Sequence, residues 1–219
     1  MALHLIDRFQ PQLRREQQAA IDAGRLRKLD EVELLGPERL RPLAVLSLYM
    51  LILSTVGFGI LNLASYSWQR HSFTFAFTFP GVVLWLVVNC VSYIVILPVH
   101  EAIHGLVIAG LGGKPYFGAK LPLALYCGAK NQLFRRDQYL LIALAPLVVI
   151  TLAAIVLTLL SPVAASYVFF ATIGNFSGAA GDVWSAQRVL SLPTDVLIED
   201  TQTGYRVWEI VPNRPDVSV

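Results

Sequence analysis

The hydrophobic positions of the chain fall into four long runs, at residues 43–65, 81–111, 139–160 and 163–180. About 20 apolar residues cross the hydrocarbon core of a bilayer as a helix, so each run qualifies as a transmembrane helix. Pro98 and Pro146 lie inside two of the runs, which transmembrane helices tolerate where neighbouring groups satisfy the freed backbone carbonyls. The pattern predicts an all-α polytopic membrane protein with about four transmembrane helices.

Polar segments flank and separate these runs. The first residues lack the basic start and long apolar stretch of a secretory signal peptide, so none is expected. A helical pattern runs from Gln12 to Leu35, and its loose apolar stripe fits either a helix on the membrane surface or a solvated helix packed on the protein. Residues 112–138 mix glycines with apolar residues, which predicts a hairpin or loop at the membrane boundary. In the tail, a short cytoplasmic β-hairpin is predicted to turn at Thr203-Gly204.

Composition and charge agree with a membrane protein. The chain of 219 residues is 55% hydrophobic and 15% charged, whereas soluble domains carry about 25% charged residues. Of its 17 Lys and Arg residues, sixteen lie in residues 1–42, in residues 112–138 or in the tail after Asp182. The remaining one, Arg70, lies in the loop between the first two runs. By the positive-inside rule we expect a multi-pass protein of the cell membrane with both termini in the cytoplasm.

The predicted organisation has three parts: a cytoplasmic N-terminal amphipathic segment (1–42), a transmembrane core (43–182) and a cytoplasmic tail (183–219). The lipid bilayer is the first predicted partner. The net charge of +2 gives no reason to expect nucleic-acid binding, and the sequence does not set the oligomeric state. Two cysteines, Cys90 and Cys127, are too few for a disulfide framework.

The residues that carry chemistry lie in the second run, in the sequence His100-Glu101-Ala102-Ile103-His104. Two histidines at i and i+4 lie on one face of a helix, where they can share a Zn²⁺ ion with Glu101 beside them. These are the only Asp, Glu, Lys, Arg or His residues between Gly81 and Leu111. Ionisable groups inside a membrane segment are costly, so we interpret them as a functional site. A buried hydrogen-bonded cluster without a metal is the structural alternative.

Catalytic zinc usually has three protein ligands and a water, so a third ligand must come from elsewhere in the chain. The candidates are His4, His71, Asp137 and Asp182. With four spans, the second and fourth runs both cross from outside to inside. Asp182 ends the fourth run at the depth of the two histidines, and it is therefore the predicted third ligand.

The fourth run also carries small residues and an amide close to Asp182. Gly174, Gly178 and Gly181 have the spacing that lets two membrane helices approach closely. Asn175 lies two turns before Asp182 on nearly the same face. We expect Asn175 to orient a metal ligand, to bind a substrate carbonyl, or to make an interhelical polar contact.

Together these segments resemble a known group of enzymes. The motif from His100 to Gly105 on a membrane helix, followed by Asn175 and Asp182, looks like a membrane zincin of the site-two protease type. The run 175–182 and the later residues 192–201 more closely resemble a bacterial family of membrane zincin peptidases classed as a domain of unknown function. The resemblance covers roughly residues 80–205. It implies His100, His104 and Asp182 as zinc ligands and Glu101 as catalytic base.

We therefore hypothesise a zinc-dependent membrane-embedded endopeptidase, in which Glu101 is the general base for a zinc-activated water. A membrane protein or a peptide is the predicted substrate, and the apolar segment 118–126 is one candidate for holding it as an extra strand. Two other classes remain open. One is a catalytically silent membrane chaperone or assembly factor, and the other is a small proton or ion transporter.

Overall fold

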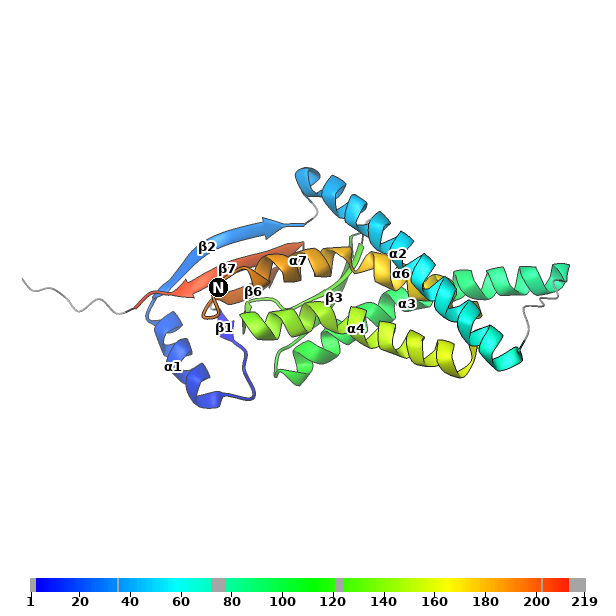
Figure 1. The fold of residues 1–219 in the computed structure, drawn as a ribbon. Helices are drawn as coiled ribbons and strands as arrows, with labels where there is room; N and C mark the ends of the chain where they lie inside the picture. Colours follow the sequence, from blue (N-terminus) through cyan, green and yellow to red (C-terminus); the bar gives the residue numbers. More distant parts are fainter. Residues whose placement is uncertain (1–2, 35, 72–77, 121–123, 202, 213–219) are drawn as a thin grey trace, which may run out of the picture. The chain divides into compact units, whose positions relative to one another are not determined.

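The computed structural model describes residues 3–34, 36–71, 78–120, 124–201 and 203–212 (Figure 1). The chain divides into two compact units. One unit combines Met1–Pro37, Ile103–Ala143 and Trp184–Val219, and the other combines Glu38–Ala102 and Leu144–Val183. Each unit is therefore assembled from segments that lie far apart in the sequence.

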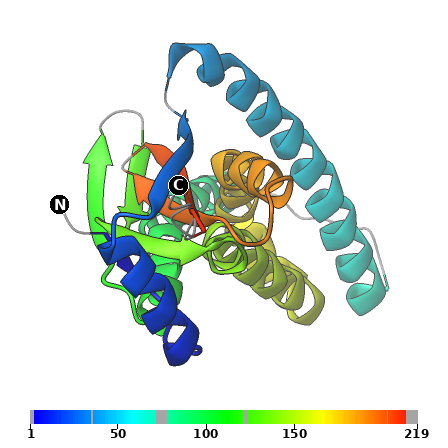
Figure 2. The same cartoon turned by 90° about the vertical axis from the view of Figure 1, so that its left-hand side faces the viewer.

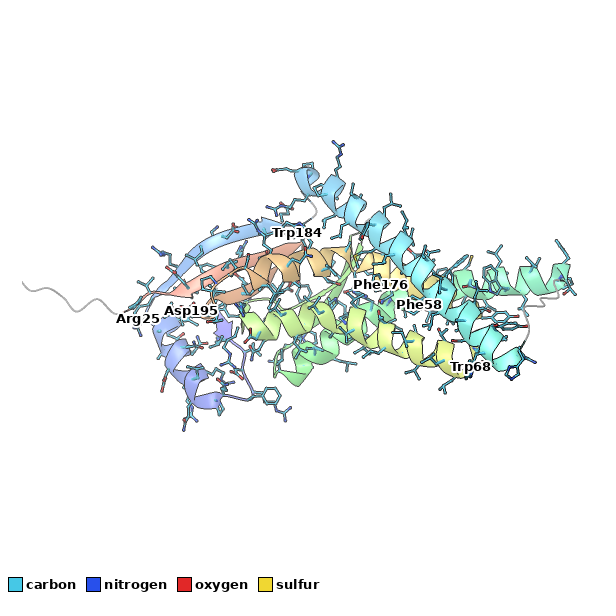
Figure 3. The ribbon with its side chains drawn as sticks, viewed as in Figure 1. Arg25, Phe58, Trp68, Phe176, Trp184 and Asp195 are labelled. Carbon is cyan, nitrogen blue, oxygen red and sulfur yellow. The ribbon has the colours of Figure 1, made fainter. Side chains whose placement is uncertain are left out.

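Three of the predicted transmembrane runs form single long helices: α2 (Pro37–Arg70), α3 (Phe79–Gly110) and α4 (Arg136–Leu160). Among the described residues these are the helices long and apolar enough to cross a membrane, with mean hydropathies of 2.1, 2.5 and 3.0. Few of their residues are buried within the protein, and apolar side chains stand out along them, including Trp68 at the end of α2 (Figure 3). Apolar surface of this extent is stable only against other apolar matter, which a bilayer provides.

The fourth apolar run does not form one continuous helix, contrary to the sequence prediction. It is broken into α5 (Pro162–Tyr167), α6 (Phe169–Gly178) and α7 (Ala180–Leu190). At the first break Val168 leaves the helical conformation, and the side chain of Asn89 on α3 satisfies the freed backbone groups. Its Nδ2 donates to the Ser166 carbonyl at 3.0 Å, and its Oδ1 accepts from the Phe170 N–H at 2.9 Å. A long-range contact of this kind has no signature in local hydropathy.

The prediction of an all-α protein is wrong, because one unit contains a five-stranded mixed sheet. Its strand order is β1-β5-β6-β7-β2, with β1 parallel to β5 and the other pairs antiparallel. The strands are β1 (His4–Leu5), β5 (Gln132–Arg135), β6 (Leu197–Thr201), β7 (Gly204–Ile210) and β2 (Leu26–Glu33). They come from both ends of the chain and from the loop before α4, so local patterns did not reveal their pairing. Only the β6–β7 hairpin was predicted, and it is confirmed.

The predicted helix from Gln12 to Leu35 is correct only in its first half. Helix α1 (Pro11–Asp22) ends where Gly24 adopts a positive φ of 74°, and the chain then continues as β2. A left-handed residue stops a helix, and glycine adopts that conformation without steric cost. Helix α1 lies beside the sheet, in contact with β1 and β7 (Figure 2). Its Ala20 is buried, and Ile21 packs against the core formed by β1, β5 and β6. Helix α1 is therefore packed on the protein, as one of the two sequence alternatives expected.

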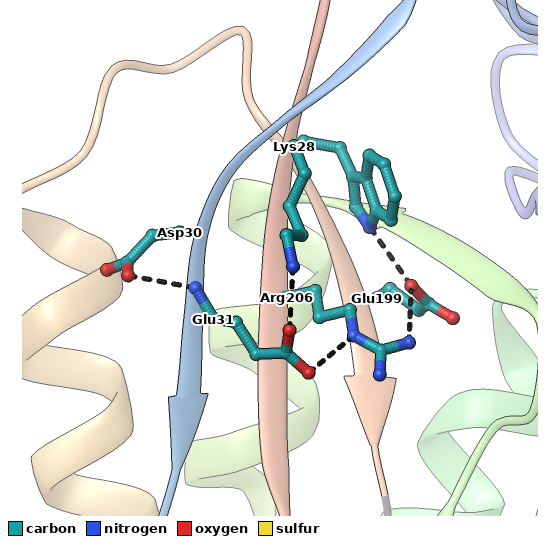
Figure 4. Close-up of polar contacts among 6 residues, drawn as sticks. Lys28, Asp30, Glu31, Glu199 and Arg206 are labelled. Carbon is teal, nitrogen blue, oxygen red and sulfur yellow. Dashed lines mark hydrogen bonds and ion pairs between the residues drawn. The ribbon is translucent and has the colours of Figure 1, made fainter.

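The loop after α3 contains the predicted hairpin, formed by β3 (Tyr116–Lys120) and β4 (Ala124–Gly128) in an antiparallel pair. Residues 121–123 at its turn lie outside the described part of the chain. A polar network on the five-stranded sheet joins Lys28 and Glu31 of β2 to Arg206 of β7 and Glu199 of β6 (Figure 4). Hydrogen bonds from Lys28 and Arg206 lower the pKa of Glu31.

The main hydrophobic core of this unit joins the sheet to the ends of three helices. Phe134, Ile198, Tyr205 and Val207 of the sheet are fully buried. They belong to one cluster with residues of α3, α4 and α7, namely Ile108, Tyr139, Ile142, Ala143 and Val189. The sheet therefore fixes the end of α3 just beyond His104 and the start of α4.

Candidate metal centre

Helix α3 carries both histidines of the predicted motif on one face, because residues four apart in an α-helix are separated by about one turn. His100 is 13% exposed and His104 is 7% exposed. Glu101 follows His100 directly and is half-buried. The motif thus lies near the C-terminal end of a helix that is apolar over most of its length.

The ring of His100 contacts one polar side chain through each nitrogen. Nδ1 lies 2.9 Å from Oδ1 of Asn175 on α6, and Nε2 lies 3.1 Å from Oδ2 of Asp182 on α7. Since Oδ1 of Asn175 is an acceptor, Nδ1 of His100 donates to it. At the other nitrogen, the short distance between Nε2 and Oδ2 of Asp182 is favourable when a proton or a metal ion lies between the two atoms, so this pair could also share a metal.

The ring of His104 is held in the same way, but by the backbone. Its Nδ1 donates to the Ile142 carbonyl of α4 at 2.8 Å in a buried environment, so Nε2 is the nitrogen of this ring that could bind a metal. Metal-binding histidines characteristically donate their other ring N–H to a protein oxygen, which fixes tautomer and ring orientation. The sequence did not indicate a role for Ile142, because every residue has a backbone carbonyl and the residue type does not show which carbonyl contacts a ligand. The only signal was Pro146, four positions later.

His100, His104 and Asp182 each offer one ligand atom, and these atoms all lie within 4.8 Å of one another. Two imidazoles and one carboxylate form a donor set that binds zinc with an open position for water or substrate. The residues present therefore fit the metal that the sequence predicts. Asp137, another candidate, is 81% exposed and pairs with Arg136.

The contacts between α3 and α6 explain why Asp182 reaches His100. Asn89, Tyr93 and His100 follow one another along α3 and contact Phe170, Gly174 and Asn175 in the same order along α6. The two helices are therefore parallel, as the sequence argument about shared depth requires. The Asn175 contact is the predicted interhelical one, and its buried Nδ2 has no hydrogen-bond partner in the described part of the chain.

Only one of the three glycines proposed for close helix packing serves that purpose in the described structure. A Cβ on Gly174 would clash with the ring of Tyr93. A Cβ on Gly178 or Gly181 would meet no described atom within 4 Å. These two glycines instead lie where α6 ends and α7 begins, which places Asp182 in the first turn of a new helix. A carboxylate is favoured at that position because the helix dipole is positive at its N-terminus.

The β3–β4 hairpin packs against α3 beside the motif. Gly105 follows His104, and a Cβ there would come within 2.6 Å of Cζ of Phe117 on β3. The absence of a side chain at Gly105 therefore lets the hairpin approach the helix closely. Within the hairpin, burial and the nearby Asp200 carboxylate raise the pKa of Tyr116 to about 12, so this phenol stays neutral at physiological pH.

Comparison with known protein families gives a match over part of the chain. Residues 93–197 match the model of a protein family described as "Putative zincin peptidase". The matched range contains His100, Glu101, His104, Asn175 and Asp182. No curated protein and no solved structure matches the chain.

Proposed function

We propose that this protein, whose residues 93–197 match the model of a family described as "Putative zincin peptidase", is a zinc-dependent endopeptidase embedded in a membrane. The observation that carries the proposal is the convergence of His100, His104 and Asp182 on one point, with both histidines oriented through Nδ1. A bound zinc ion would polarise the scissile carbonyl and acidify a water molecule, which is the chemistry that peptide hydrolysis needs.

The side chains of the motif have separate roles in this proposal. Glu101 lies beside the ligand face of α3 without being part of the ligand group, which suits a general base. It accepts a proton from the attacking water and returns that proton to the leaving amine. Asn175 and the Ile142 carbonyl hold the two imidazole rings in place. The open coordination position leaves room for the reacting groups.

We further propose that the β3–β4 hairpin holds the substrate. A peptide must be extended for attack on its backbone, and an exposed strand edge binds extended peptides through main-chain hydrogen bonds. In the described part of the chain, β3 and β4 pair only with each other, and Phe117 of β3 touches the helix directly after His104. The substrate class is a membrane protein or a membrane-bound peptide, since α2, α3 and α4 have the length and hydropathy of spans.

The proposal is tested by measuring the zinc content and the cleavage rate of the wild type and of a variant that lacks the Glu101 carboxylate. Purified protein is expected to hold about one zinc ion per chain, and Glu101→Gln is expected to retain it while losing about 10²–10⁴-fold in cleavage rate. Proteomics of membranes that contain wild type or Glu101→Gln identifies the substrates as proteins that accumulate uncleaved in the variant. Asp182→Asn is expected to lower zinc content.

The matched control is Asp137→Asn, which changes an exposed carboxylate outside the ligand group and should leave zinc and cleavage unchanged. Wild-type protein without zinc would contradict the proposal. A full zinc complement with identical membrane proteomes for wild type and Glu101→Gln would instead favour a catalytically silent chaperone.

A further inference from the structure

The carbonyl that holds His104 is available because of a proline. In an α-helix the carbonyl of residue i accepts a hydrogen bond from the N–H of residue i+4. For Ile142 in α4 that residue is Pro146, which has no N–H, so the carbonyl lacks its helical partner. The Nδ1–H of His104 takes that place at 2.8 Å.

This pairing satisfies two groups that would each be costly alone. A backbone carbonyl without a partner is expensive in an apolar, water-poor segment, and α4 is such a segment. The buried imidazole of His104 also needs a fixed acceptor if its Nε2 is to point consistently toward the other ligand atoms. A proline is unfavourable inside a helix, so its presence four residues after Ile142 calls for a compensating role.

We infer that Pro146 is a positioning residue of the metal centre, which frees the Ile142 carbonyl to hold His104 as the Nδ1–H tautomer with Nε2 available for the metal. The inference rests on the proposed function for the identity of the metal. The hydrogen bond between His104 and Ile142 is independent of it. Pro146 lies one turn from that carbonyl and acts on the metal only through His104.

The variant Pro146→Ala tests this directly, because it restores an N–H that competes with His104 for the Ile142 carbonyl. We expect its zinc affinity, measured on the purified full chain in detergent by competition with a chromophoric chelator, to fall about 10–100-fold. We also expect metal-free Pro146→Ala to unfold at the same or a higher temperature than wild type, since alanine is a better helix former. A loss of metal affinity without a loss of stability separates positioning from a general structural effect.

Pro42→Ala is the matched control, because Pro42 is also a proline inside a helix but belongs to α2 and lies outside the ligand group. It should leave zinc affinity unchanged. A second readout needs no metal: the ring ¹⁵N shifts of His104 in metal-free protein report its tautomer. These ¹⁵N signals are assigned to His104 because they disappear from the spectrum of the variant His104→Asn. Wild type should show the Nδ1–H form, and Pro146→Ala a mixture of the two tautomers.

The two proposals fail in different ways. Wild type that binds no zinc overturns the proposed function, while the tautomer measurement still decides the role of Pro146. Pro146→Ala with wild-type tautomer and wild-type zinc affinity overturns the positioning role and leaves the peptidase proposal intact.

Discussion

At the scale of residues, the candidate centre depends on groups that do not themselves bind the metal. Asn175 is 3% exposed, and its Oδ1 accepts the Nδ1–H of His100. Without that acceptor the ring can rotate, and the proton can move to the nitrogen that faces Asp182. We therefore expect Asn175→Ala to bind zinc about 10–100-fold more weakly than wild type in the same chelator competition.

The control for this prediction is Ser177→Ala on the same helix. The hydroxyl of Ser177 donates to the Gly174 carbonyl of its own helix and contacts no ligand residue in the described structure, so its loss should not change zinc affinity. Equal affinities for Asn175→Ala and wild type would show that the contact between Asn175 and His100 does not orient the ring.

The sequence predicted the side chains of this candidate centre but not the backbone carbonyl of Ile142 that contacts His104. His100, Glu101 and His104 are recognisable because a motif of fixed spacing lies in a segment otherwise without charge. Asp182 followed from the direction of the helices, and that direction depends only on counting spans and basic residues. The Ile142 carbonyl could not be found in this way. The sequence indicates a backbone carbonyl without its helical hydrogen bond only where a proline, which has no N–H, lies four residues later.

At the scale of elements, the contact between α3 and α6 is closest at one glycine. Gly174 packs against Tyr93, and the next residue, Asn175, meets His100 about two turns further along α3. Gly174→Ala forces the ring or the helix to move, and overpacking of this kind typically costs about 1–3 kcal/mol. Gly178→Ala meets no described atom within 4 Å, so the free energy of unfolding should stay the same or rise by up to about 1 kcal/mol.

The opposite signs expected for these two variants are checked by denaturant titration of each in the same detergent. Both replace a glycine of α6 by alanine, and the structure shows a close contact with another helix, that with Tyr93, at Gly174 but not at Gly178. Equal stabilities for the two variants would mean that α3 and α6 do not depend on Gly174 for their close approach.

The elements differ in how far the sequence specified them. Helices α2, α3 and α4 were predicted because a long apolar run admits few other structures. The β3–β4 and β6–β7 hairpins were predicted because their pairing is local. The central sheet was not, since β1 has two residues, β5 has four, and both pair with segments distant in sequence. The breaks between α5, α6 and α7 depend on Asn89 of another helix and were equally invisible.

At the scale of the whole molecule, the five-stranded sheet limits the ways in which α2, α3 and α4, which are long and apolar enough to span, could cross a membrane. Strands β1 and β2 precede α2, β5 lies between α3 and α4, and β6 and β7 follow α7. Strands bonded in one sheet must lie on the same side of a bilayer. Two crossings by α2 and α3 satisfy this condition. If α4 also crosses, the short helices α5 and α6 must return the chain, although neither is long enough to span alone.

This topology predicts the labelling of single cysteines introduced into a chain whose Cys90 and Cys127 have been replaced. Cysteines at the exposed positions of Arg15, Lys130 and Arg188, all in the unit that contains the sheet, should react with an impermeant maleimide only in inside-out vesicles. A cysteine at Arg70, the last residue of α2, should react only in right-side-out vesicles, because a crossing by α2 puts its two ends on opposite sides. Fourteen of the 17 Lys and Arg residues belong to the sheet unit, so its side should be cytoplasmic.

Labelling of position 188 on the opposite side from positions 15 and 130 would mean that α5 and α6 do not return the chain. Asp182 would then leave the depth of the two histidines, and the ligand group of the proposed zinc site would be incomplete.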